Sequence, residues 1–410
     1  MRNYYAKNIK KNIRVPFLML CYYVTCMLYS LHAYMFWHID NTVLTLIIVS
    51  ATILVHIFYA KFYLYKNMNI ALFAILAVLL GTHGNINGYL FNVVNIFPFL
   101  SFLFLKDNYK YSVFFSWRKV FNIIIAVSLI CYIMVTIGVN LPYMMDFYGD
   151  TTSDSYYLVK NYFVFVQLSS SFTEIPLERF LSIFLEPGYL ACLIVMIFFI
   201  DGFKFKENKS NYILLTALFL TFSIAGYTLF VVFYMIRRMK NSKYRLRAIL
   251  GVACLICAIY LYGTLYNGGD NGINNQVLAR FQYDDQRGTI EGYNRTTEAF
   301  DVYFNKFISS SSVFMGDPIS YSRLFGDGGA NVGIKYYIMV YGLAGLFAYC
   351  LFLFSPFIRL IKKSYLTLSF MLLWFIIFAR GNFVMWMDAF LITYIFGLIA
   401  IEDEHIDDAI

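Results

Sequence analysis

Charged residues are scarce in this chain. Asp, Glu, Lys and Arg make up 14% of its 410 residues, whereas soluble domains carry about 25%. Hydrophobic residues make up 60% of the chain, and the mean hydropathy is +0.64. This composition excludes a soluble enzyme and predicts that most of the chain lies in lipid.

Other absences exclude further classes. The sequence has no repeat period, no low-complexity or Pro-rich linker, and no soluble domain at either end. Its seven cysteines lie in apolar runs without supporting His or Asp neighbours, which indicates neither a disulfide framework nor a metal site. They are Cys21, Cys26, Cys131, Cys192, Cys254, Cys257 and Cys350. The net charge of +8 is no nucleic-acid signal, because in a membrane protein its meaning depends on where the cations fall.

What the chain has instead is a series of apolar runs long enough to cross a bilayer. They lie at about 15–37, 42–60, 70–81, 89–105, 120–140, 181–200, 248–264, 332–357, 365–379 and 384–401. A backbone in lipid must satisfy its own hydrogen bonds, so these runs are predicted to be helices. The expected fold class is all-α, a polytopic integral membrane protein with about 11–12 transmembrane helices. The basic start, Met1 to Arg14, leads into the first run without a cleavage site, which predicts a retained first span.

The segment from Tyr212 to Ile236 is ambiguous, because 25 residues are too few for two ordinary spans and basic clusters flank both ends. A single crossing would place the second cluster outside, against the positive-inside rule. We therefore predict two half-length helices that break near Ser223 to Gly226. Irregular backbone at that depth is tolerated only where protein or a watery cavity covers it, so the break predicts a functional interior.

The basic residues support one orientation. With both termini inside, 23 of the 32 Lys and Arg residues fall on the inner side and nine on the outer side. The whole chain, residues 1–410, is then one transmembrane domain. Two substantial loops face outward, the first at 141–178 and a long one at 265–331, and most of the polar chemistry lies in them.

Five arginines lie in the outer loops or at the span ends: Arg179, Arg280, Arg287, Arg295 and Arg323. Arginine presents a planar fork that binds phosphate oxygens, although near a membrane it also pairs with lipid headgroups. Headgroup or structural pairing is an equal alternative for any one of them. For the set it is weaker, because the positive-inside rule works against cations outside. An anionic ligand at the outer face would explain them.

Glu186 is the ionisable residue within an otherwise apolar run, and a charge at membrane depth is costly enough to suggest function. Its structural interpretation is helix capping, because Pro187 suits the first turn of a helix and acidic groups suit its amino terminus. The two interpretations are compatible. A carboxylate at a helix start facing an outer cavity can also act as a general base.

Two residues lie at outer junctions, and two further features belong to the long loop. His83 and Arg380 could line the same cavity, although an isolated histidine is more often a satisfied interfacial residue and Arg380 could merely snorkel. Phe300, Tyr303, Phe304 and Phe307 are spaced as one apolar face of a helix, which we expect to lie along the membrane interface. The Gly-rich stretch 326–331 is typical of a flexible loop.

Taken in order, these features resemble one family. Arg179 precedes Phe184-x-Glu186-Pro187-Gly188-x-x-Ala191, and a broken pair surrounds Thr221-Phe222-Ser223-x-x-Gly226-Tyr227. A long arginine-bearing outside loop follows, and then Tyr341-Gly342-Leu343-Ala344-Gly345-Leu346. This order, over most of the chain, is similar to that of the Wzy family of O-antigen polymerases.

The resemblance implies a bacterial inner-membrane glycosyltransferase of the GT-C type that acts at the periplasmic face. It would join oligosaccharide repeat units carried on undecaprenyl diphosphate, with membrane lipid around it and a chain-length regulator protein as a candidate partner. It implies no cofactor, nucleotide sugar or obligatory metal. As hypotheses, Arg179, Arg287 and Arg295 would hold the diphosphates and stabilise the departing charge, and Arg287 is a catalytic candidate for that reason. Arg280, Arg323, His83 and Arg380 are further binding candidates. Glu186 is the best candidate for activating the acceptor hydroxyl, but which group takes the proton stays open.

Three other classes are weighed against this one. A lipid-linked oligosaccharide flippase or other transporter is the main alternative, although the polar groups gather in loops rather than within spans. A membrane O-acetyltransferase would want a histidine-centred site, for which His83 is an isolated candidate. A purely structural scaffold leaves the outer arginines without a reason.

Overall fold

The computed structural model describes residues 16–39, 41–59, 68–80, 96–150, 155–168, 179–239, 242–271, 273–284, 289–290, 298–325, 333–359, 364–381 and 386–407. Within these residues the protein is mostly helical and has few strands. Two segments from the sequence analysis lie outside the described residues. They are the basic start, Met1 to Arg14, and the Gly-rich stretch 326–331.

The chain forms two compact units. The first comprises Met1–Val120 and Arg295–Ile410, and the second comprises Phe121–Asn294. The first unit contains α2 (Phe17–Ser30), η1 (Tyr34–Phe36), α3 (Asn41–Tyr59), α4 (Met68–Leu80), α6 (Phe97–Leu103), α12 (Glu298–Ile308), η5 (Ser311–Val313), α13 (Pro318–Phe325), α14 (Gly333–Arg359), α15 (Tyr365–Arg380) and α16 (Asp388–Asp407). Helix α7 (Asp107–Thr136) crosses the boundary between the units.

The second unit holds the remaining elements. They are β1 (Met144–Asp150), β2 (Ser155–Asn161), β3 (Val166–Leu168), α8 (Pro187–Ile200), α9 (Ser210–Leu220), α10 (Ile224–Met239), α11 (Ser242–Leu265), η2 (Tyr266–Gly269), η3 (Asn274–Leu278), η4 (Ala279–Phe281), β4 (Tyr283–Asp284) and β5 (Thr289–Ile290). Every predicted apolar run thus contains a helix, and the bounds agree to within two residues for α3, α4 and α15 but differ more for the others.

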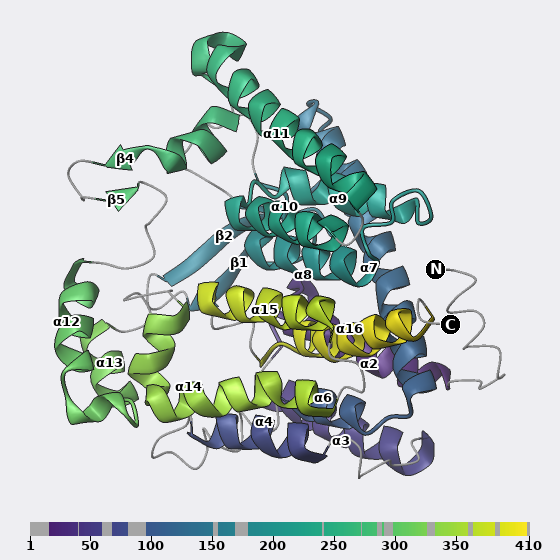
Figure 1. Cartoon of the computed structure of the whole chain (residues 1–410), viewed down its shortest axis with the longest axis vertical. Coiled ribbons are helices and arrows are strands. Elements are labelled where there is room, and N and C mark those ends of the chain that lie inside the picture. Colours follow the sequence, from purple (N-terminus) through teal and green to yellow (C-terminus); the bar gives the residue numbers. More distant parts are fainter. Residues whose placement is uncertain are drawn as a thin grey trace. The chain divides into compact units, whose positions relative to one another are not determined.

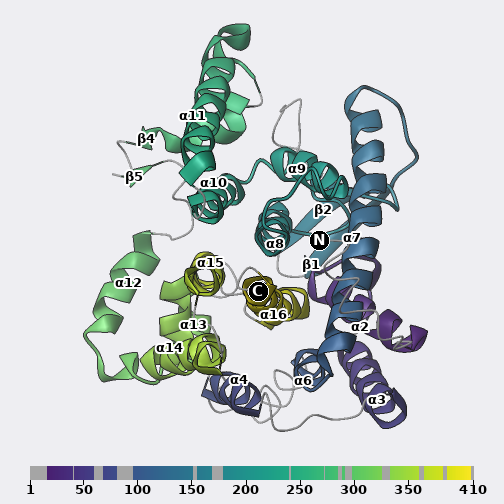
Figure 2. The same ribbon diagram turned by 45° about the vertical axis from the view of Figure 1, so that its right-hand side comes forward.

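Helix α16 lies at the centre of the first unit, because its residues from 388 to 401 are almost all buried. It packs against α2, α6 and α15, and α4 lies beside α14 in both ribbon views (Figure 1, Figure 2). The Tyr394 ring stacks on Trp374, with 5.6 Å between ring centroids, and its hydroxyl donates to the Leu353 carbonyl at 2.6 Å. A helix that is apolar on all sides is a buried helix.

Helix α14 is interrupted at Gly342, whose φ is 69°. The loop between η5 and α13 crosses this interruption and pairs with backbone groups on both sides of it. The Ala344 N–H donates to the Phe314 carbonyl at 2.9 Å, and the Asp317 N–H donates to the Met339 carbonyl at 2.6 Å. The long loop is therefore fastened to α14 by main-chain hydrogen bonds.

The predicted interfacial helix exists as α12, but its apolar face does not face lipid. Phe300, Phe304 and Phe307 are buried in a cluster with Val313 and Tyr321. The same cluster includes Met339 and Val340 of α14. The 3.6-residue spacing indicated an apolar face correctly, but a face of that kind packs on protein as readily as on lipid. The interfacial prediction for this face is wrong.

Helix α8 is the centre of the second unit, with α9 and α10 against it (Figure 1, Figure 2). Described side chains from Leu190 to Ile200 are all buried. Helices α8 and α10 approach closely at Gly226, because a Cβ atom built there would lie 2.6 Å from Cβ of Ala191. A glycine is required where backbones come this close.

The helical fold class is confirmed in its main feature, but the two loops that were predicted to face outward contain short strands. The first loop, 141–178, contains β1, β2 and β3, paired antiparallel in the order β1-β2-β3, with Asp150 opposite Ser155. A second pair, β4 and β5, lies in the long loop at 265–331. The aromatic and β-branched side chains of 156–159 favour strands. The all-α prediction missed this signal.

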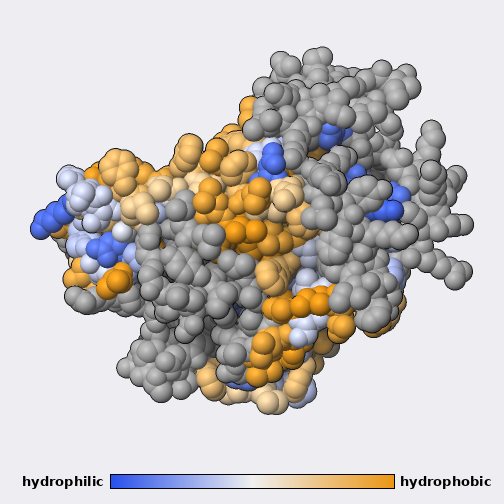
Figure 3. All heavy atoms as spheres, turned by 90° about the horizontal axis from the view of Figure 1, so that it is seen from below, coloured by the Kyte–Doolittle hydropathy of each residue, from blue (hydrophilic) through white to orange (hydrophobic). Residues whose placement is uncertain are grey.

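Among the described residues, two helices are long and apolar enough to cross a membrane, Asp107–Thr136 and Gly333–Pro356. Six shorter apolar helices of 10–17 residues accompany them. Orange, apolar side chains cover much of the described surface seen in Figure 3. Along α7 the exposed aliphatic residues are Ile123, Val127, Ile130 and Ile133, and the exposed Ile137 directly follows the helix. Their spacing of 4, 3, 3 and 4 puts them on one helix face.

Candidate functional site

The segment that leads into α8 is held in place from three sides. The Phe180 N–H donates to the Leu220 carbonyl at the end of α9, at 2.8 Å. The Val166 N–H of β3 donates to the Ser182 carbonyl at 2.8 Å. The buried Ser182 hydroxyl donates to the Ser128 hydroxyl of α7 at 2.8 Å. Residues 179–186 therefore have a defined path across α7, β3 and α9.

The break between α9 and α10 falls at Thr221, Phe222 and Ser223, next to the predicted position. Phe222 has a φ of 46°, which ends α9. The Thr221 hydroxyl donates to the Leu218 carbonyl at 2.7 Å, and the Ser223 hydroxyl accepts from the Gly226 N–H at 3.3 Å. The latter contact is that of an N-cap, so a serine starts α10. Whether the two helices form a re-entrant pair stays a prediction.

Arg179 lies against this break. Its Nε donates to the Thr221 carbonyl at 3.0 Å, and its guanidinium lies in the neighbourhood of Tyr227. The side chain is half-buried. The Tyr227 hydroxyl itself donates to the Phe219 carbonyl. A cation is thus fixed where the carbonyl groups at the end of α9 lose their helical partners.

Glu186 is the N-cap residue of α8, and Pro187 is the first residue of that helix, as predicted. Its side chain makes no capping hydrogen bond and is half-buried. The helix start is therefore confirmed, whereas the capping role proposed for the carboxylate is not. An acidic group at a helix amino terminus is still favoured by the helix dipole.

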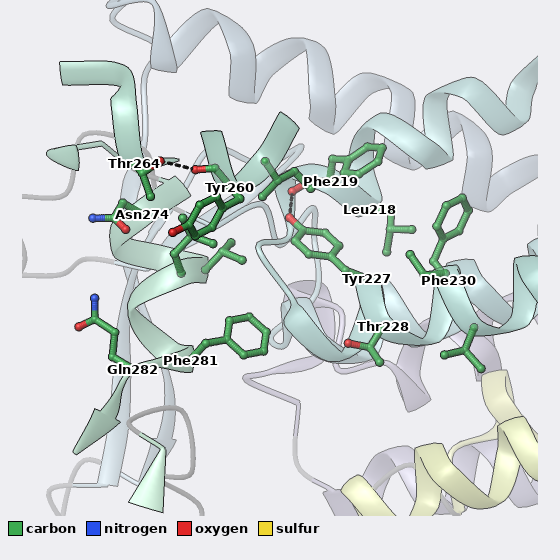
Figure 4. Close-up of a pocket in the computed structure, with 15 residues that line it drawn as sticks. Leu218, Phe219, Tyr227, Thr228, Phe230, Tyr260, Thr264, Asn274, Phe281 and Gln282 are labelled. Atoms are coloured by element: carbon green, nitrogen blue, oxygen red, sulfur yellow. Dashed lines mark hydrogen bonds between the residues drawn. The ribbon is translucent and has the colours of Figure 1, made fainter. Parts of the chain in front are cut away.

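A pocket of about 630 Å³ lies between α9, α10 and α11 with η3 and η4. Its lining is largely apolar and comes from Leu218, Phe219, Tyr227, Thr228, Phe230, Val231, Val232, Ile259, Tyr260, Thr264, Asn274, Val277, Leu278, Phe281 and Gln282. Figure 4 shows Thr264, Asn274 and Gln282 together on one side, with Leu218 and Phe230 on the other. The Tyr227 ring is part of the wall, so the pocket adjoins the break that Arg179 contacts.

The other predicted site residues are described only in part or not at all. His83, Arg287 and Arg295 lie outside the described residues. Arg280 has its backbone in η4, between the pocket residues Leu278 and Phe281, and Arg323 has its backbone in α13, but their side chains are not among those described. Arg380 is half-buried in the last turn of α15, in the first unit. Of the predicted residues with described side chains, Arg179 and Glu186 share the second unit and one connected segment.

The sequence prediction missed the pocket and the part that Tyr227 takes in it. The signal was present in the long loop, where Ile273, Val277 and Leu278 are spaced as one helix face. That face packs on α11 at Gly263, where a Cβ atom would lie 2.5 Å from Cδ1 of Leu278. Among the described residues, no group of three or more His, Cys, Asp or Glu side chains is placed to hold a metal ion.

No family model matches the chain, and no match was found among curated proteins or solved structures.

Proposed function

We propose that this protein is a membrane-embedded glycosyltransferase of the O-antigen polymerase type. It joins oligosaccharide repeat units carried on undecaprenyl diphosphate at the periplasmic face of a bacterial inner membrane. The growing chain leaves its lipid diphosphate and is transferred to a hydroxyl of the next lipid-linked unit. In this proposal the architecture is GT-C-like, with multiple spans and both termini cytoplasmic.

One observation carries the proposal: a fixed arginine, a helix break and an apolar pocket adjoin one another in one compact unit. Arg179 contacts Thr221 in the break, and Tyr227 connects the break to the pocket. A diphosphate attached to a hydrocarbon chain needs a cation beside an apolar surface. Two motifs that carry the family resemblance also meet here, because Gly226 packs on Ala191.

Arg179 has a direct role in this chemistry. The leaving group is a diphosphate, on which negative charge develops as the glycosidic bond to the lipid breaks. A preorganised cation beside a developing anion is one of the strongest sources of rate enhancement in enzymes. Because the Thr221 carbonyl orients the guanidinium through Nε, the fork is held before substrate binds.

Glu186 is the candidate base in the same segment. It lies seven positions after Arg179, along a path that hydrogen bonds fix at both Phe180 and Ser182. Its carboxylate is not used in capping α8, so it remains a group that can take the proton of the acceptor hydroxyl.

The exposed face of α7 supports the membrane setting. A stripe of five isoleucine and valine residues on the surface of a soluble protein would be an aggregation hazard. In lipid the same stripe is the ordinary outer face of a span. The window of α7 that qualifies as a span is only 28% buried, so α7 is not shielded as the core helix of a soluble protein would be.

The first experiment is a gel of lipopolysaccharide from a host strain in which this gene is deleted. If the protein is a polymerase, the deletion strain should make lipopolysaccharide core that carries a single repeat unit. The wild-type gene should restore the full ladder. An unchanged ladder would contradict the proposal. The matched complementation uses Arg179→Ala, which should leave the single repeat.

A flippase for lipid-linked oligosaccharides is the second candidate, and a buried carboxylate favours it. Asp388, at the start of α16, is 3% exposed, and its Oδ1 has no hydrogen-bond partner within the described part of the chain. Carriers place such groups along ion or proton paths. If the protein is a flippase, the same gel of the deletion strain should show core with no repeat unit at all. One experiment therefore separates the two functions.

A further inference from the structure

Basic side chains from two separate segments meet at one end of the second unit. One segment is the turn between α8 and α9, and the other is the last turn of α10. Arg237 packs against the first segment, because a Cβ atom built on Gly202 would lie 3.2 Å from its Nη2. The Nη2 of Arg238 donates to the Phe203 carbonyl at 3.1 Å. We call the resulting cluster the basic patch, which consists of Lys204, Lys206, Lys209, Arg237 and Arg238.

The basic patch lies at the opposite end of α8 and α10 from the break that Arg179 contacts. These two helices run side by side in the same direction, since Gly226 packs on Ala191 near their starts. Near their ends, Cζ of Arg237 lies 5.5 Å from the centroid of the Phe199 ring. The helices have 14 and 16 residues, which corresponds to about 21 and 24 Å at 1.5 Å per residue. The basic patch is therefore separate from the site around Arg179.

The charge of the basic patch is only partly balanced. Its five basic residues are accompanied in the turn by two acidic ones, Asp201 and Glu207. Asp201 is 2% exposed, and its carboxylate accepts from Nδ2 of Asn211 at 3.1 Å, so it lies below the surface. Lys206 and Lys209 are exposed, and within the described residues neither side chain forms a salt bridge or a hydrogen bond. These two ammonium groups can therefore bind an anion from outside the protein.

The helix dipoles do not explain these lysines. Arg237 and Arg238 are in the last turn of α10, where the dipole favours cations. Lys209 is the N-cap residue of α9 and makes no capping hydrogen bond. At that end of a helix the dipole disfavours a cation and favours an anion. A bound anion would be stabilised by both the lysines and the start of α9.

We infer that the basic patch binds the headgroup of an anionic phospholipid. Basic clusters at the cytoplasmic ends of helices bind such headgroups, and the orientation predicted from the basic residues puts both segments on the inner side. Tyr212, in the first turn of α9, is 51% exposed, and tyrosine is enriched at the membrane interface. This exposed ring beside Lys209 favours a lipid over a free phosphate ester. The inference goes beyond the proposed function, because the lipid is not a substrate.

The test titrates full-length purified protein in dodecyl maltoside with dioleoylphosphatidylglycerol and counts bound lipids by native mass spectrometry. Dioleoylphosphatidylcholine is the neutral reference with the same acyl chains. We expect the anionic lipid to bind about tenfold more tightly or better. Excess glycerophosphoglycerol, which is the headgroup without acyl chains, should leave the bound lipid in place.

Three lysine variants localise the binding. Lys206→Gln and Lys209→Gln should each lower the affinity for dioleoylphosphatidylglycerol about fivefold, which is the effect of one basic residue near an anionic lipid surface. The matched control is Lys306→Gln, at an exposed lysine of α12 in the first unit, which should leave the affinity unchanged. Because these side chains are exposed, all three variants should keep the melting temperature of wild type.

Equal affinity for the two lipids would overturn the inference. So would equal losses in all three variants, or no loss in Lys206→Gln and Lys209→Gln. Displacement by glycerophosphoglycerol would also overturn it, because the basic patch would then be a site for soluble phosphate esters. None of these readings involves elongation of repeat units, so a failure of the proposed function would leave them unchanged.

Discussion

The helical backbone is interrupted within α14 and between α9 and α10, and different groups bind the backbone at these two places. In α14 the break at Gly342 is bridged by main-chain groups of Phe314 and Asp317. Between α9 and α10 the break at Thr221 is met by the side chain of Arg179. The first break is filled tightly by backbone, since a Cβ atom on Gly342 would lie 2.3 Å from the Phe314 oxygen. The second adjoins a pocket of about 630 Å³.

The comparison separates a structural joint from a candidate site. Backbone groups freed by a break must be satisfied, and either solution does that. A main-chain bridge leaves no room and no charge for a ligand. An arginine beside an open pocket supplies both, although each interruption belongs to a motif of the same family resemblance. We therefore expect damage at the α9–α10 break to affect chemistry, and damage at Gly342 to affect folding.

Arg179→Ala should produce the largest effect. Loss of a preorganised charge at the leaving diphosphate is expected to lower the elongation rate by about 10²–10³-fold, as for an oxyanion-hole donor. Arg179→Lys retains the charge without the planar fork and should recover only part of the rate. Rates are measured per folded molecule on purified protein with lipid-linked repeat units. Equal rates for Arg179→Ala and wild type would remove the distinction between the two breaks.

Glu186→Gln tests the base in the same segment. The amide retains the shape of the side chain but cannot accept the proton, so we expect the rate to fall by about 10²-fold. The melting temperature should fall only slightly, because the carboxylate makes no capping hydrogen bond and only its interaction with the helix dipole is lost. A protein made in normal amounts that elongates normally would exclude Glu186 as the base and leave Arg179 in place.

Gly342→Ala should act on stability instead. The alanine would adopt a φ of 69° and meet the Phe314 oxygen, which together are expected to cost about 3 kcal/mol or more. Thermal unfolding followed by tryptophan fluorescence measures the loss. The rate per folded molecule should stay near that of wild type. A specific loss of rate without a loss of stability would place the interruption of α14 in the chemistry after all.

Gly226→Ala should have the smallest effect of the four. Its Cβ atom would lie 2.6 Å from that of Ala191, and overpacking of this kind costs about 1–3 kcal/mol. Adding Ala191→Gly should restore most of the stability. Gly251→Ala is the matched control, because no atom lies within 4 Å of a Cβ atom there. If the control is destabilised as much as Gly226→Ala, close approach of α8 and α10 is not the cause.

The sequence predicted what depends on neighbouring residues. It placed the break near Ser223 and the start of α8 at Pro187, because helix ends are set by local chemistry such as capping and the fixed φ of proline. It also predicted the apolar face of α12. Each of these features can be identified within a few residues of chain.

Features that depend on residues distant in the chain were missed. The face of α12 packs on Met339 and Val340, about forty residues later, and no local pattern distinguishes that partner from lipid. The contact of Arg179 with Thr221 joins residues 42 positions apart, and the pocket needs three helices to assemble. The strands of the first loop are a different failure, because their aromatic and β-branched residues were a usable signal.

The most direct test is elongation by the isolated protein. Full-length protein in nanodiscs would receive lipid-linked single repeats extracted from the deletion strain, and the products would be separated by length. We predict lipid-linked chains of two or more repeats with release of undecaprenyl diphosphate, and neither product from Arg179→Ala. Single repeats that remain unchanged in the presence of folded wild-type protein would contradict the proposed function.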